Sequence, residues 1–230
     1  MSPAEVVDEV VTTFASRVRA TLASGRRFAL AVPGGSFATR VFPSLATLDL
    51  DWPRIDLTWV DERVVPMSDP ESNQKAAHDL WLSRLAGPGP RLIAPPVAMG
   101  GVAQVAAGWQ AALVTTLGSP PRLDLVVVGV GSDGHVASLF PAHPVLDCLD
   151  VWVAGVSDSP KPPPSRVTLT RATLSHAREI WVVAFGSGKA SAIADARRNP
   201  ASTLPVALVA RSGPAVRWFL DEEAEGLKKH

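Results

Sequence analysis

Residues 123–130 read Leu-Asp-Leu-Val-Val-Val-Gly-Val, and this almost continuous apolar run is the feature that most constrains the fold. A strand with one face in water alternates apolar and polar residues, whereas a strand covered on both faces in a parallel sheet does not. Shorter runs of the same kind recur along the 230 residues. We expect strands at residues 27–32, 55–60, 123–130, 151–156, 180–185 and 206–210.

Segments with a helical period separate these runs. In the first of them apolar residues recur every four positions, which predicts a helix with one buried face. We expect helices at residues 4–23, 37–48, 71–85, 102–117 and 190–197. Pro43 lies inside the second segment and predicts a kink or a later start there. The alternation predicts an α/β fold: a doubly wound, mostly parallel, Rossmann-like sheet with helices on both faces, formed by residues 1–230 as one domain.

The charge balance excludes several classes of partner. The chain has 22 basic and 22 acidic side chains, whereas nucleic-acid binders and polybasic membrane-surface proteins carry an excess of Lys and Arg. No apolar run approaches the ~20 residues that span a bilayer, and the acidic N-terminal segment does not resemble a signal peptide. The single cysteine, Cys148, cannot form an internal disulfide. We therefore expect a cytoplasmic monomer or small homo-oligomer that binds neither nucleic acid nor membrane.

In a doubly wound sheet, ligands bind beyond the carboxyl ends of the strands, so the residues after each strand carry the functional signal. The first strand is followed by Pro-Gly-Gly-Ser, in which Gly34 and Gly35 permit a tight turn and Ser36 can cap the next helix. Free N–H groups at such a helix start form an anion site. The same residues also suit an ordinary turn.

The second strand is followed by Asp61, Glu62 and Arg63. Carboxylates at a ligand-binding edge can orient sugar hydroxyls, and a guanidinium can clamp a phosphate. A solvated surface cluster would show the same three residues. Asn73, near the start of the following helix, is placed to reach the same cleft.

The third strand end reads Gly-Val-Gly-Ser-Asp-Gly-His and has the G-x-G-x-x-G spacing of a dinucleotide site. Pro141 and Pro144 interrupt the crossover helix that such a site requires, so we reject dinucleotide binding. The loop then presents Asp133 and His135 at the sheet edge. A histidine there can act as a general base near neutral pH, with the aspartate positioning either the imidazole or the substrate.

Two further segments place cations near strand ends. The fifth strand leads into Gly-Ser-Gly-Lys, whose Lys189 suits a single phosphate although the segment departs from a P-loop. Arg166 follows three consecutive prolines, which make a stiff loop. Four glycine-rich or basic sites at successive strand ends favour a small phosphorylated ligand.

These residues resemble those of the 6-phosphogluconolactonases, whose fold group also contains glucosamine-6-phosphate deaminases and ribose-5-phosphate isomerases. The matching segments keep the family's order and span most of the chain: residues 33–36, 61–66, 72–73, 129–141, 166–170 and 186–189. After the Asp-Gly-His element the chain reads Ala-Ser-Leu-Phe-Pro, as lactonases do, where deaminases have Asn-Glu-Pro-Gly. Phe37 stands where the family often has Thr, which removes one hydroxyl contact to phosphate.

The resemblance implies hydrolysis of the ring ester of 6-phosphoglucono-δ-lactone, a sugar-phosphate lactone of the oxidative pentose phosphate pathway, without a metal or cofactor. It implies that His135 takes a proton from the attacking water and that Asp133 orients either His135 or this water. The implied substrate-binding residues are Gly34, Gly35, Ser36, Asp61, Arg63, Asn73, Gly131, Arg166 and Lys189. Two alternatives stay open: a sugar-phosphate isomerase or deaminase with Asp61 or Glu62 as its base, and a non-catalytic sugar-phosphate sensor.

Overall fold

The computed structural model describes residues 1–213 and 215–227, and its centre is a sheet of six parallel strands. The strands lie in the order β4-β2-β1-β5-β8-β9, so the sheet grows outward on both sides of the β1–β5 pair. Their bounds are β1 Phe28–Val32, β2 Ile55–Trp59, β4 Arg91–Leu92, β5 Leu125–Val128, β8 Glu179–Ala184 and β9 Ala215–Leu220. This is the predicted doubly wound α/β architecture, and such sheets bind ligands at the point where the strand order reverses.

A second, antiparallel sheet has three strands in the order β3-β7-β6. Their bounds are β3 Asp61–Arg63, β6 Val153–Val156 and β7 Arg166–Leu169. The strand predicted at residues 151–156 therefore exists, but it belongs to this small sheet and not to the parallel one. The sequence did not predict β3, because a strand of three charged residues has no apolar pattern.

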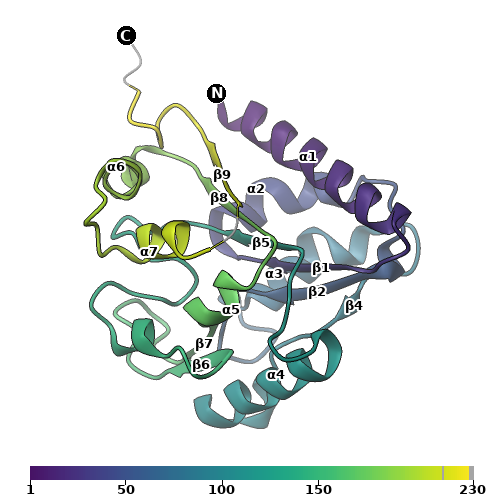
Figure 1. Ribbon diagram of the computed structural model, residues 1–230. Coiled ribbons are helices and arrows are strands. Elements are labelled where there is room, and N and C mark those ends of the chain that lie inside the picture. The colour runs from purple at the N-terminus through teal and green to yellow at the C-terminus, as the bar shows by residue number, and fades with distance from the viewer. Residues whose placement is uncertain (214, 228–230) are drawn as a thin grey trace.

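The helices form two layers (Figure 1). Helices α1, α2 and α3 pack against one another on one side of the main sheet, and α4 packs against the small sheet on the other. Their bounds are α1 Pro3–Ala23, α2 Gly35–Leu45, α3 Asn73–Leu80, α4 Val102–Leu117, α5 Arg171–Ser175, α6 Ala190–Arg198 and α7 Pro205–Arg211. None of the described helices is long and apolar enough to cross a membrane.

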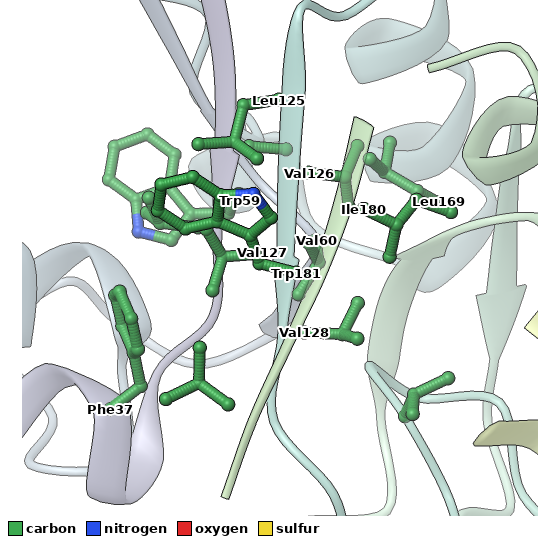
Figure 2. Packing of buried hydrophobic residues seen from close by; sticks show 14 of the residues in the cluster. Phe37, Trp59, Val60, Leu125, Val126, Val127, Val128, Leu169, Ile180 and Trp181 are labelled. Carbon is green, nitrogen blue, oxygen red and sulfur yellow. The ribbon is translucent and has the colours of Figure 1, made fainter. Parts of the chain in front are cut away.

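The core follows the two-residue period of the strands. On β5, Leu125 and Val127 point to one side and Val126 and Val128 to the other, and all four are buried (Figure 2). Trp181 of β8 packs with Val127 on the first side. Each fully buried side chain of this kind contributes roughly 1.5–3 kcal/mol of hydrophobic free energy. Burial on both sides therefore explains the continuous apolar run in the sequence.

The segment at residues 206–210 is helical, so the strand predicted there is wrong. It lies in α7, which begins at Pro205 after the extended residue Leu204. Proline is favoured at the first helical position, and a short apolar run does not by itself distinguish a strand from a buried helix. The sixth parallel strand is β9, in which Arg217 interrupts the apolar pattern.

Helix α2 begins at Gly35 and continues through Pro43 to Leu45, so the later start expected from the proline is wrong. Pro43 lacks the N–H that would bond to the carbonyl of Thr39. Thr39 is exposed, so water can satisfy that carbonyl. The early start brings Gly35 and Ser36 into the first helical turn.

Candidate active site

A cleft of about 210 Å³ opens beyond the carboxyl ends of β1, β2, β5 and β8, beside β3 and the loop between β6 and β7. The structure brings all nine predicted substrate-binding residues and His135 to this cleft. Asp133 is not among the lining residues but contacts His135. The cleft is lined by Pro33, Gly34, Gly35, Ser36, Asp61, Arg63, Asn73, Gly129, Val130, Gly131, His135, Ala137, Lys161, Arg166 and Lys189.

The start of α2 forms one wall of the cleft. Gly34 is the N-cap residue and no side chain caps the helix, so the first-turn N–H groups lack an intrahelical partner and the positive end of the helix dipole lies at the cleft. Ser36 is the second helical residue, and the capping role predicted for it is wrong. Gly35 has φ +60°, a conformation that suits glycine. A Cβ atom on Gly34 would overlap the side-chain amide of Asn73, so both glycines are needed here.

Glu62 is completely buried and organises the start of α3. Its carboxylate accepts the backbone N–H groups of Arg63, Asn73 and Gln74 at 2.8, 2.8 and 2.7 Å. It also accepts the hydroxyl of Ser72 at 3.3 Å. Burial raises the pKa of Glu62 above its usual value, although the three backbone N–H groups oppose this shift. With both oxygens engaged, Glu62 holds the helix in place and is not available to a substrate.

Asp61 is buried as well, but it lines the cleft. Its Oδ2 accepts the hydroxyl of Ser138 at 2.7 Å and lies 3.8 Å from Nη1 of Arg166. The amide Nδ2 of Asn73 donates to the backbone carbonyl of Asp61 at 2.9 Å and lies 3.4 Å from its Oδ1. This network fixes Asn73 against the Gly34 turn.

The two arginines of the cleft are engaged to different extents. Arg63 donates from Nη1 to the carbonyl of Glu71 at 2.5 Å, and its buried Nε has no partner among the described residues. Arg166 has a side chain only 5% exposed and donates to the carbonyls of residues 161–163 at 2.9–3.3 Å. Arg63 therefore retains donors for an anion, whereas most donors of Arg166 are used within the protein.

Asp133 and His135 form a close pair in the loop after β5. Nδ1 of His135 lies 2.5 Å from Oδ1 of Asp133, which leaves Nε2 as the ring nitrogen able to accept a proton. Burial lowers the pKa of His135 below its ordinary value, although Asp133 opposes this, and the shift favours the neutral imidazole. Burial raises the pKa of Asp133, but hydrogen bonds from His135 and Lys161 outweigh it and bring that pKa to about 2.

Lys161 is a charged cleft residue that the sequence reasoning missed. Its Nζ lies 3.1 Å from Oδ2 of Asp133 and 3.4 Å from Nδ1 of His135. It comes from the loop between β6 and β7, far from these residues in the sequence. The sequence showed only that a lysine lies in the proline-rich loop. Which residues it contacts depends on how the small sheet packs against the main sheet.

His143 lies outside the cleft lining. Its Nε2 is 3.0 Å from Asp158, and its Nδ1 accepts the backbone N–H of Val145 at 3.1 Å. Within residues 1–213 and 215–227, no group of three or more His, Cys, Asp or Glu side chains is placed to hold a metal ion.

Comparisons with known proteins identify the family of this chain. Residues 1–218 match the family model described as glucosamine-6-phosphate isomerases/6-phosphogluconolactonase. The chain is 36% identical to the 6-phosphogluconolactonase of Rattus norvegicus, over 98% of this chain and 91% of that protein. It is 34% identical to the probable 6-phosphogluconolactonase 3, chloroplastic, of Oryza sativa subsp. japonica, over 96% of this chain and 72% of that protein.

A solved structure of 6-phosphogluconolactonase from Trypanosoma brucei matches with a TM-score of 0.86 and 25% identity, covering 99% of this chain and 97% of that chain. The rice relative is named as a chloroplast protein, so the family does not fix the compartment, and the cytoplasm stays a prediction. The chain belongs to the glucosamine-6-phosphate isomerase/6-phosphogluconolactonase family, and the relatives named here are its lactonases.

Proposed function

We propose that this protein hydrolyses 6-phosphoglucono-1,5-lactone to 6-phosphogluconate, with His135 as the general base. The 2.5 Å contact between His135 Nδ1 and Asp133 carries the proposal, because it orients the imidazole and leaves Nε2 to accept a proton. Hydrolysis of a lactone needs a water activated beside the carbonyl carbon. The lactonases among its relatives support the substrate class.

The phosphate would bind at the α2 wall of the cleft. The first-turn N–H groups of Gly35 and Ser36 suit a dianion, because a helix N-terminus carries a partial positive charge. Lys189 and Arg63 line the same cleft, and Arg63 adds a guanidinium to the site. A substrate anchored by its phosphate loses rotational freedom before the reaction, which lowers the entropic part of the barrier.

The chemistry then needs one proton carrier. Nε2 of His135 takes a proton from water as the water oxygen bonds to C1, and C1 becomes tetrahedral with a negative oxygen. When the bond between C1 and the ring oxygen breaks, the ring oxygen takes the proton from Nε2. The imidazole is neutral again, and the product is the open-chain acid, whose carboxyl proton passes to solvent.

Gly131 contributes to this site through its missing side chain. Its N–H donates to the carbonyl of His135 at 2.8 Å, so it closes the loop and is engaged before a substrate arrives. The negative charge on the tetrahedral oxygen would therefore be stabilised by the cationic side chains that line the cleft.

The deaminase alternative finds less support in this geometry. Glu62 has no free oxygen, which removes one of the two bases considered for it. Asp61 lines the cleft, but both of its carboxylate oxygens lie near donors from Ser138 and Asn73. Glucosamine 6-phosphate and fructose 6-phosphate are therefore the substrates to include as competitors in the assay.

The test is the rate of 6-phosphogluconate release from freshly made lactone, corrected for spontaneous hydrolysis. The native protein should exceed the spontaneous rate, and His135→Ala should lose at least ~100-fold in kcat. His78→Ala is the matched control, because His78 is exposed on α3 away from the cleft and should leave the rate unchanged. No rate above the spontaneous one with the native protein would refute the lactonase assignment.

A further inference from the structure

Among the described residues, one backbone hydrogen bond spans the loop between β6 and β7, from the N–H of Ser159 to the carbonyl of Pro164 at 3.1 Å. Residues 162–164 are three consecutive prolines and carry no backbone N–H groups, so they cannot donate to a partner strand. The carbonyls of residues 161–163 instead accept hydrogen bonds from Arg166, at 3.0 Å from Nε and at 2.9 and 3.3 Å from Nη2. Because the Arg166 side chain is only 5% exposed, water does not compete strongly for these bonds.

A second tether acts on the same loop. The hydroxyl of Ser159 donates to the carbonyl of Lys161 at 2.8 Å. The same hydroxyl accepts a hydrogen bond from the backbone N–H of Lys161 at 3.2 Å. Lys161 is thus fixed at its carbonyl by Arg166 and Ser159 and at its N–H by Ser159. A lysine side chain is flexible, but these hydrogen bonds fix the backbone of Lys161 from which the side chain extends.

The fixed backbone places the Lys161 ammonium against the pair in the loop after β5. We propose that Arg166 is a positioning residue, which holds the proline loop so that Lys161 contacts both Asp133 and His135. Nζ reaches Oδ2 of Asp133 at 3.1 Å, which leaves Oδ1 of that carboxylate for Nδ1 of His135. This inference rests on the proposed role of His135, and it gives Arg166 a function other than the phosphate contact expected from the sequence.

The arrangement has a consequence for the proton that His135 carries. Asp133 on its own loop and Asp61 on β3 favour the imidazolium, whereas Lys161 opposes it. The other charged groups that line the cleft are Arg63, Arg166 and Lys189. A correctly placed Lys161 keeps His135 neutral at lower pH and makes the imidazolium a stronger acid toward the departing ring oxygen. A displaced Lys161 would let His135 hold its proton to higher pH.

The experiment is an NMR titration of the His135 ring in protein labelled at histidine, which needs no turnover and is assigned with His135→Gln. Lys161→Met should raise the His135 midpoint by about one pH unit. Arg166→Lys keeps the charge but cannot make the three-carbonyl contact, and it should raise the midpoint in the same direction. The double variant should go no further than Lys161→Met alone. Lys189→Met removes a cation of the same cleft that has no contact with the pair and should move the midpoint far less.

Ser159→Ala removes one tether of the Lys161 backbone without changing a charged residue, so it replaces Arg166→Lys as the test if that variant does not fold. We expect it to raise the His135 midpoint by less than Lys161→Met does. A folded Arg166→Lys or Ser159→Ala protein with the wild-type midpoint would overturn the inference, and so would an unchanged midpoint in Lys161→Met. Absence of lactonase activity in the native protein would instead overturn the proposed function, and the titration would still report on the loop.

Discussion

Arg63 and Arg166 stand directly opposite each other in the antiparallel ladder of β3 and β7. Like charges at such a cross-strand position destabilise a sheet, typically by a few tenths to about 1 kcal/mol. Asp61, 3.8 Å from Arg166, and Glu71, 3.4 Å from Arg63, each offset part of this repulsion. Both arginines line the cleft, so the repulsion is concentrated where an anion would relieve it. Since Arg166 already donates to backbone carbonyls, we expect a bound anion to interact mainly with Arg63.

Replacing Arg63 by Gln should therefore weaken recognition of the phosphate. We expect kcat/KM for the phosphorylated lactone to fall about 10- to 100-fold, mostly through KM, because a charge-assisted contact is lost. Hydrolysis of glucono-1,5-lactone, which has no phosphate, should change little. Arg122→Gln, an exposed arginine outside the cleft, is the control. Equal losses on both lactones would show that Arg63 does not bind the phosphate.

The pH dependence of kcat/KM should report the His135–Asp133 pair. Burial lowers the pKa of His135, so the acidic limb of the profile should have its midpoint below about 6.5 and the rate should be level near neutrality. Asp133→Asn removes a charge that favours the imidazolium, so the midpoint should move to still lower pH. The plateau should drop by on the order of 10²–10⁴, because the ring loses its orientation. Stopped assays across pH 4–8 would measure both effects, and a midpoint that rises in Asp133→Asn would contradict this account.

The sequence predicted the site residues that follow the parallel strands better than the site residues that the small antiparallel sheet positions. The residues that follow β1, β2, β5 and β8 converge because parallel strands end at one edge, and that rule needs no side-chain detail. Lys161 was missed because it reaches Asp133 only through the β6–β7 hairpin, whose pairing the sequence pattern did not reveal. Glu62 was misjudged for a related reason: a motif of three charged residues does not show which of them is buried beneath a helix start.

The buried carboxylate of Glu62 should contribute strongly to stability. Glu62→Gln places an amide NH₂ where backbone N–H groups of α3 now donate to an oxygen, so at least one donor loses its acceptor. We expect the free energy of unfolding to fall by about 2–3 kcal/mol, which urea denaturation would measure. Glu9→Gln, on the exposed face of α1, should change it by less than about 0.5 kcal/mol. Equal stability of the two variants would mean that the Glu62 contacts are not maintained in solution.

Gly131 should be required for activity because the side chains of His135 and Asp133 pack directly against its backbone. A Cβ atom there would overlap Nδ1 and Cε1 of the His135 ring and Oδ1 of Asp133, whereas a Cβ atom on Gly129 would meet nothing within 4 Å. Gly131→Ala should therefore push the imidazole out of its position while the buried strand β5 remains intact. We expect kcat to fall by about 100-fold or more with little change in the melting temperature, since a displacement of about 1 Å suffices for such a loss. Gly87→Ala inserts the same methyl group into open space away from the cleft, so it is the control and should keep the activity. A fully active Gly131→Ala protein would show that the reaction does not depend on where this ring is held.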